Sequence, residues 1–265
     1  MHPAAARSTA AIWDELLSLQ AELFIPSELA FFLEAPELRN ARSILDVGCG
    51  NGDYVANLCG YLPGTRFTGI DVSAELVAAA ARRHDEPQLA FAHRDFFDYV
   101  PAGAPHDAIL FRFVVQHLRD FGAVLRHAAS CLAPGGSVVV IEVDRDASLA
   151  QPAMPRFDAM IDAYVGEAAR RGRMRAQLDR MAAIATGLPG WTVVREAPIR
   201  VPFLGPFEGT KVARLYQSWI DICERTGGFE HPFDDVRSEV SSWARESSAF
   251  SRLAGRALQI RRDPN

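Results

Sequence analysis

The first 35 residues carry apolar side chains at the spacing of a helix. The repeat steps by three and four, at Ile12, Leu16, Leu19 and Leu23. Trp13, Leu17 and Phe24 widen the same stripe. Pro26 and Pro36 interrupt it, so the pattern predicts several short helical pieces at the N-terminus.

From residue 43 onward the pattern alternates between short strands and helices. Apolar or alternating runs predict strands over residues 43–48, 66–72, 88–95, 106–113 and 137–143. Helical spacing predicts helices over 53–62, 73–84 and 118–132, the second with Ser73 as its N-cap. Residues 152–186 read as mostly helical, and 191–201, 212–225 and 255–262 as a strand, a helix and a final strand. This alternation predicts an α/β fold with a doubly wound, mostly parallel sheet.

Composition narrows the range of partners. The 265 residues carry a net charge of −5, and no run of Lys or Arg is suited to neutralising several phosphates, which argues against nucleic acid. None of the four cysteines forms a C-x-x-C pair or has a histidine at ligand spacing, which argues against structural zinc. The first residues lack an apolar leader, and no run of eighteen apolar residues occurs. We therefore expect a cytoplasmic protein, monomeric or homodimeric, with no membrane partner.

The stretch ILDVGCGNGDY, residues 44–54, places Gly48, Gly50 and Gly52 directly after a predicted buried strand. Three glycines permit positive φ angles and the close approach of a ligand to the backbone. A loop at the carboxyl end of the first strand is where doubly wound folds bind ligands. A dinucleotide loop would read G-x-G-x-x-G, but here Asp53 stands in the last position and the third glycine comes one residue early. An NAD(P)-binding protein is therefore the disfavoured alternative.

This glycine pattern, with Asp46 two residues before it, resembles motif I of the class I S-adenosylmethionine methyltransferases. The resemblance continues through GIDVS with Asp71, HRDFFDY with Asp95, HDAILFRFVVQHLRD and LAPGGSVVVIE, in order, over about residues 40–145. It implies a seven-stranded Rossmann-like sheet, with a helical cap over 1–40, a cofactor-binding core over 41–146, a helical lid over 147–190 and the rest of the sheet domain over 191–265.

The resemblance implies S-adenosyl-L-methionine as the cofactor and a set of residues that bind it. Asp46 is expected at the cationic amino end, Asp71 at the ribose hydroxyls and Asp95 at the adenine amino group, beside an apolar wall from Phe96. The alternatives are that Asp46 binds loop amides and that Asp98 replaces Asp95. The full expected set is Asp46, Gly48, Gly50, Asn51, Asp71, Val72, Asp95, Phe96, Phe111, Arg112 and His117.

The same resemblance implies in-line methyl transfer to a small molecule, with specialised metabolism as the expected setting. The chemistry needs near-attack geometry, and a base only where the acceptor carries a proton. The catalytic candidates are His117, Asp144 and Glu142; alternatively, His117 shapes the cofactor pocket and the two carboxylates pair with arginines. No metal is expected, because Arg112 occupies the place after the fourth strand where related enzymes that use Mg²⁺ need a carboxylate.

Substrate-binding candidates come from outside the motifs: Trp13, Phe24, Arg112, Arg145 and Tyr164. The motifs predict cofactor binding and not which carbon of the sulfonium is attacked. An enzyme that cyclises the aminobutyrate arm of the cofactor and releases methylthioadenosine is therefore a second hypothesis.

Overall fold

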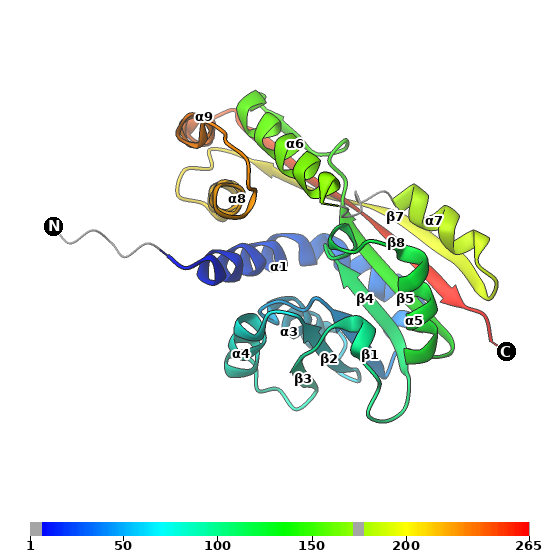
Figure 1. Cartoon of the computed structure of the whole chain (residues 1–265). Helices are drawn as coiled ribbons and strands as arrows, with labels where there is room; N and C mark the ends of the chain where they lie inside the picture. Colours follow the sequence, from blue (N-terminus) through cyan, green and yellow to red (C-terminus); the bar gives the residue numbers. More distant parts are fainter. Residues whose placement is uncertain (1–6, 172–177, 265) are drawn as a thin grey trace.

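The computed structural model describes residues 7–171 and 178–264, in which one sheet carries eight strands. The strand order is β3-β2-β1-β4-β5-β8-β6, and β7 pairs with β8 (Figure 1). The strands are β1 (Ser43–Val47), β2 (Arg66–Asp71), β3 (Leu89–His93), β4 (His106–Arg112), β5 (Leu132–Val143), β6 (Leu149–Gln151), β7 (Trp191–Leu204) and β8 (Phe250–Arg262).

Strands β1 to β5 pair in parallel, whereas β8 runs antiparallel to β5, β6 and β7. Both faces of the parallel part are buried. Ile44 joins a core cluster on one face and its neighbour Leu45 joins the cluster on the other. Because parallel strands end at a common edge, Val47, Asp71 and Arg112 come close together there.

Helices cover both faces of this sheet. Helices α1 (Thr9–Glu34), α2 (Pro36–Arg39) and α3 (Asp53–Tyr61) contribute to the core cluster on one face. Helices α5 (Phe121–Cys131) and α7 (Leu178–Gly187) contribute to the cluster on the other. Helix α4 (Ala74–Arg83) packs against β2 and β3.

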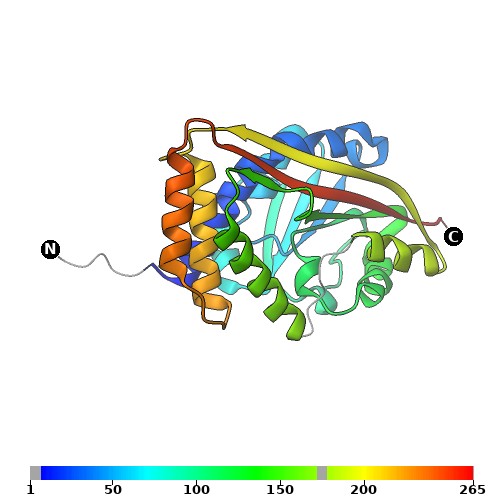
Figure 2. The same cartoon turned by 90° about the horizontal axis from the view of Figure 1, so that it is seen from above.

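A separate helical layer stands at one end of the sheet. It consists of α6 (Pro155–Arg170), α8 (Lys211–Thr226) and α9 (Phe233–Arg245), which share their own core around Phe157, Tyr216 and Trp243. Figure 2 shows α8 and α9 side by side, with α6 next to them. Helix α1 joins this layer to the sheet, since its Ile12 and Leu16 pack against Leu215 and Ile222 of α8.

The predicted α/β class and mostly parallel sheet are confirmed, with two differences in detail. The eighth strand is β6, a three-residue strand that pairs with β8 and has too few residues to show a periodicity. The break predicted at Pro26 is wrong, because α1 is a single helix of 26 residues that continues past this proline. Pro26 is exposed, so the backbone carbonyl that loses its helical partner faces solvent, while buried residues on either side hold the helix.

Among the described residues, α1 alone has the length and composition of a membrane-spanning helix, and half of that stretch is buried within the protein. Its apolar side chains Phe24, Ile25 and Phe31 lie in the core cluster that α1, α2 and α3 form on one face of the sheet. The segment 147–190 divides between two places: α6 lies in the helical layer, and α7 packs against α5 and β7.

Candidate functional site: two adjoining cavities at the edge of the sheet

Two cavities lie at the carboxyl edge of the parallel strands. The smaller, of about 400 Å³, lies against the glycine loop and the ends of β2 and β4. The larger, of about 960 Å³, lies between α6, α8 and the connection from β5 to β6. Five residues line both cavities: Gln20, Gln116, His117, Val143 and Trp219. A ligand in one cavity would therefore meet a ligand in the other along these side chains.

The glycine loop fits closely under its neighbours. Gly48 and Gly50 have φ angles of +73° and +55°. A Cβ atom on Gly48 would lie 2.4 Å from Val114, and one on Gly50 would lie 2.6 Å from Leu17 of α1. A larger residue would be strained at either position; at Gly48 it would displace Val114, and at Gly50 it would push the loop away from α1. The loop backbone thus forms one wall of the smaller cavity and α1 forms another.

Asp71, at the end of β2, fixes the loop through both carboxylate oxygens. Oδ2 accepts the Gly50 N–H at 2.9 Å, and Oδ1 accepts the Ser73 N–H at 2.8 Å. Each oxygen keeps a lone pair for a further donor. A pair of ligand hydroxyls in the smaller cavity could therefore bind the same carboxylate.

Asp46 is buried beside the loop, with 3% of its surface exposed, and lines the smaller cavity. Burial raises the pKa of this carboxyl to about 8; Arg112 opposes the shift and Asp71 adds to it. Among residues 7–171 and 178–264, no group donates a hydrogen bond to it. The site thus offers a carboxylate that a cationic ligand group would stabilise.

Arg112, at the end of β4, is committed to α1. It forms a buried ion pair of 2.9 Å with Glu28 and donates to the Gln20 carbonyl at 3.1 Å. Its guanidinium lies 4.2 Å from the ring centres of both Tyr54 and Phe113. Arg112 lines the smaller cavity, but its hydrogen bonds go to Glu28 and Gln20 of α1.

Glu142, near the end of β5, lies beneath the short turn Val115–His117 that separates the cavities. Its Oε1 accepts the Val115 N–H at 2.7 Å and, weakly, the Gln116 N–H at 3.4 Å. The residue is fully buried and its pKa is raised to about 8 by burial, against hydrogen bonds from this turn. Glu142 therefore supports the turn that carries Gln116 and His117, and it lines neither cavity.

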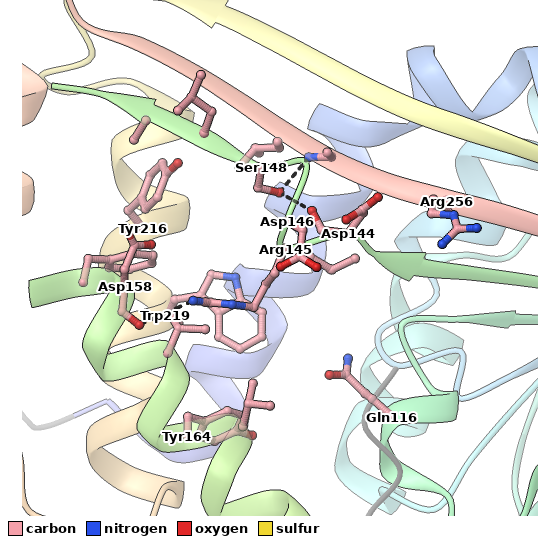
Figure 3. A pocket seen from close by; sticks show the side chains of 18 of the residues that line it. Gln116, Asp144, Arg145, Asp146, Ser148, Asp158, Tyr164, Tyr216, Trp219 and Arg256 are labelled. Carbon is pink, nitrogen blue, oxygen red and sulfur yellow. Dashed lines mark hydrogen bonds between the residues drawn. The ribbon is translucent and has the colours of Figure 1, made fainter. Parts of the chain in front are cut away.

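The larger cavity has an aromatic and aliphatic wall. Figure 3 shows Tyr164, Tyr216 and Trp219 on one side and Gln116 on the other, with the Asp144–Asp146 segment between them. Asp144 accepts the Ala147 N–H at 3.1 Å, and Arg145 forms an ion pair with Asp162 at 2.8 Å.

The structure brings most of the candidate residues to these cavities. The smaller cavity is lined by Asp46, Gly48, Gly50, Asn51, Asp71, Val72, Asp95, Phe96, Arg112 and His117. Phe111 is fully buried in the sheet core and lines neither cavity. Of the acceptor candidates, Phe24, Arg145 and Tyr164 line the larger cavity, whereas Trp13 lines the smaller one. Of the catalytic candidates, Asp144 lines the larger cavity and His117 lines both.

Two residues at the junction of the cavities, Gln20 and Trp219, are not predicted by the sequence motifs. Gln20 is a polar residue inside an apolar helical stripe, which is a detectable signal of a cavity-facing position. Trp219 follows Leu215 and Tyr216 on one face of α8, at helical spacing. Its helix is predictable, but nothing local indicates that this helix returns to the glycine loop.

Comparison with known proteins identifies relatives of the chain. Residues 45–138 match a family model described as a methyltransferase domain. A trans-aconitate 2-methyltransferase of Methylobacterium radiotolerans is 33% identical over 152 residues, covering 56% of this chain and 54% of that protein. Residues 45–138 of the chain thus form a methyltransferase domain of the S-adenosylmethionine-dependent type. The chain spans about half or less of the length of the curated relatives it matches.

Solved structures support the fold of the family. A Haemonchus contortus phosphoethanolamine methyltransferase, solved with S-adenosylhomocysteine, aligns with a TM-score of 0.60 and 16% identity, over 98% of this chain and 59% of that one. The [4+2]-cyclase SpnF aligns with a TM-score of 0.58 and 15% identity, over 99% and 98%. The family fold therefore extends beyond the motif region to nearly the whole chain.

S-adenosylmethionine is the cofactor of this family, and the smaller cavity fits it. The unpartnered Asp46 suits an ammonium group, and Asp71 retains acceptor capacity for two hydroxyls. Asp95 and the apolar side chain of Phe96 follow β3 and line the same cavity. The donors and acceptors of an amino acid, a ribose and a base thus find partners in one cavity.

Proposed function

We propose that the chain is an S-adenosylmethionine-dependent methyltransferase that acts on a small molecule. The observation that carries this proposal is the junction of the two cavities, where Gln116, His117 and Val143 line both. A cofactor in the smaller cavity and an acceptor in the larger one would face each other there. Such positioning supplies most of the catalysis that methyl transfer needs.

We assign the cofactor contacts residue by residue. Asp46 pairs with the ammonium group, Asp71 accepts the ribose hydroxyls, and Asp95 accepts the adenine amino group. Bound S-adenosylmethionine supplies a methyl group activated by its sulfonium. Helices α1, α6 and α8 cover the site and exclude water, which would compete as a nucleophile.

His117 and Asp144 are the groups placed to receive a proton from the acceptor. His117 lies at the junction and Asp144 on the wall of the larger cavity. Neither is needed where the acceptor is already an anion or a free amine. Glu142 is assigned instead to holding the Val115–His117 turn, because its Oε1 accepts from that backbone and the residue lines neither cavity.

The finer parts of the proposal concern setting and partners. We propose a cytoplasmic enzyme of specialised metabolism, monomeric or homodimeric, without a metal and without a nucleic-acid partner. The net charge of −5 supports the absence of a nucleic-acid partner, and the size of the larger cavity supports a small-molecule acceptor.

The test separates methyl transfer from other uses of the cofactor. The protein is incubated with S-adenosylmethionine alone, and then with a panel of amines, phenols and carboxylic acids that includes trans-aconitate, and the products are identified by mass spectrometry. We expect little turnover without an acceptor, and S-adenosylhomocysteine together with a methylated product from one panel member. Rapid release of methylthioadenosine without any acceptor would overturn the proposal in favour of cyclisation of the aminobutyrate arm.

A further inference from the structure

The size of the larger cavity sets the scale of its occupant. At about 960 Å³ it lies at the upper end of the range of small-molecule sites. Its walls are largely apolar, with side chains from α6, α8 and β8 that include Phe157, Ile161, Tyr164, Leu215, Tyr216 and Leu253. A small, highly charged molecule would leave most of this surface without contacts.

The arginines that line the cavity are mostly neutralised by the protein itself. Arg145 is paired with Asp162 on α6, at 2.8 Å. Arg256 on β8 is paired with both Asp179 and Glu196. The positive charges of Arg145 and Arg256 are thus balanced within the protein, so neither guanidinium adds a net positive charge that would favour a ligand carboxylate.

The carboxylates that line the cavity are not neutralised in the same way. Asp144 and Asp146 follow β5, and Asp158 lies across the cavity on α6. None of the three forms an ion pair within the described part of the chain, where Arg180 is the remaining lining cation. Burial raises the pKa of Asp158; Arg145 opposes this shift, and Asp162 and Glu239 add to it. A positive charge on the ligand would relieve this excess of negative charge.

We propose that the acceptor is a bulky, largely apolar molecule that carries a protonated amine, with its apolar body against α6 and α8 and its ammonium group toward Asp144, Asp146 and Asp158. This inference rests on the proposed function, because it takes the larger cavity as the acceptor site. It concerns how the acceptor is recognised and leaves open which of its atoms receives the methyl group.

The test uses three fluorescent probes with one anthracene body and different charges. These are 9-anthracenylmethylamine, 9-anthracenemethanol and 9-anthracenecarboxylate, each titrated into the protein saturated with S-adenosylhomocysteine. We expect the amine to bind roughly tenfold more tightly than the alcohol, as for a hydrogen bond to a charged group, and the carboxylate to bind most weakly. Equal or tighter binding of the carboxylate would overturn the inference.

Three variants locate the probe and separate this test from that of the proposed function. Asp158→Asn should reduce the preference for the amine and leave the affinity for the alcohol unchanged. Ala168→Trp, on the cavity wall, should abolish binding of all three probes, while Ala159→Trp, exposed on the same helix and outside the lining, should not. Both tryptophan variants should still bind S-adenosylhomocysteine. If the wild-type protein does not bind S-adenosylhomocysteine, the proposed function is contradicted. If it does, but the carboxylate probe binds as tightly as the amine or more tightly, only the proposed acceptor class is contradicted.

Discussion

Burial of the charged Asp46 carboxylate is unfavourable for the folded chain. Its carboxyl is buried without a donor from the described residues, and burial raises its pKa to about 8. The ordinary pKa in an unfolded chain is about 4, so the folded protein binds more protons between these values. The contribution of Asp46 to the free energy of unfolding therefore falls as pH rises from about 4 to about 8. A ligand ammonium would offset this loss.

The first prediction concerns the pH dependence of cofactor binding. Below its pKa of about 8, Asp46 must release a proton before it can pair with an ammonium group. The affinity for S-adenosylhomocysteine should therefore rise between pH 6 and 7.5, by at most about tenfold per pH unit. Calorimetry at several pH values measures this slope. In Asp46→Asn the slope should vanish, and a wild-type affinity that does not change with pH would contradict the assignment.

Asp71 provides a second prediction at the same scale. Asp71→Ala removes an acceptor for two backbone N–H groups and for the ribose hydroxyls. The affinity for S-adenosylhomocysteine should fall by roughly 1.5–3 kcal/mol, the range for hydrogen bonds to a charged group. Asp85→Ala, exposed and outside both cavities, is the matched control. An unchanged affinity in Asp71→Ala would show that other residues hold the ribose.

Motif residues were predictable because the loop after β1 and the end of β2 are local features of the sequence. Asp46 and Asp71 line the smaller cavity for that reason. Phe111 and Glu142 were not placed correctly by position alone. Successive strand residues point to opposite faces, and which face meets the cavity depends on the neighbouring strands and helices. Phe111 instead packs against Phe96, with ring centres 5.1 Å apart.

At the scale of elements, α1 is held to the sheet by a buried ion pair. Glu28→Ala would leave the Arg112 guanidinium buried without its partner, which costs about 3–5 kcal/mol. We expect denaturant unfolding to show a loss of this size. The double variant Glu28→Met with Arg112→Met should recover most of it, since both charges are then removed. A loss below about 1 kcal/mol in Glu28→Ala would mean that the pair behaves like a surface ion pair.

A second set of polar contacts joins α1 to the glycine loop. The side-chain amide of Asn51 donates to Asp14 at 2.7 Å, and Arg83 of α4 pairs with the same carboxylate at 2.8 Å. Asp14→Ala should loosen α1 over the smaller cavity. The dissociation rate of S-adenosylhomocysteine should rise by roughly tenfold, the size of one lost hydrogen bond, with less change in its association rate. Stopped-flow displacement measures both rates.

The control for this experiment lies on the same helix. Ser27→Ala removes a hydrogen bond from the far end of α1 to Arg200 of β7 and should leave both rates unchanged. If Asp14→Ala also leaves the dissociation rate unchanged, α1 does not control cofactor release through this contact.

Most elements could be predicted from the sequence, and the failures share a cause. Ser73 caps α4 as expected, because capping depends on residues only three apart. The continuity of α1 through Pro26 could not be predicted, because packing on both sides of the proline maintains the helix. Residues 205–249 show one recognisable helix in the sequence, yet they form two, α8 and α9, in the helical layer.

For the whole molecule, the two cavities are built from segments far apart in the chain. The smaller takes its walls from α1 and the strand ends, and the larger from α6, α8 and β8. Figure 2 shows how the helical layer stands at one end of the sheet. Trp219 lines both cavities, although about 170 residues separate it from the glycine loop in the sequence. Periodicity and local motifs carry no information on such a contact.

The central claim is that the smaller cavity binds S-adenosylmethionine, and calorimetry with S-adenosylhomocysteine and NAD⁺ tests it most directly. The geometry of Asp46, Asp71 and the glycine loop predicts one S-adenosylhomocysteine bound per chain and no binding of NAD⁺. Asp71→Ala and Asp46→Asn should each weaken that binding, and Asp85→Ala should not. Binding of NAD⁺ in preference to S-adenosylhomocysteine would contradict the account.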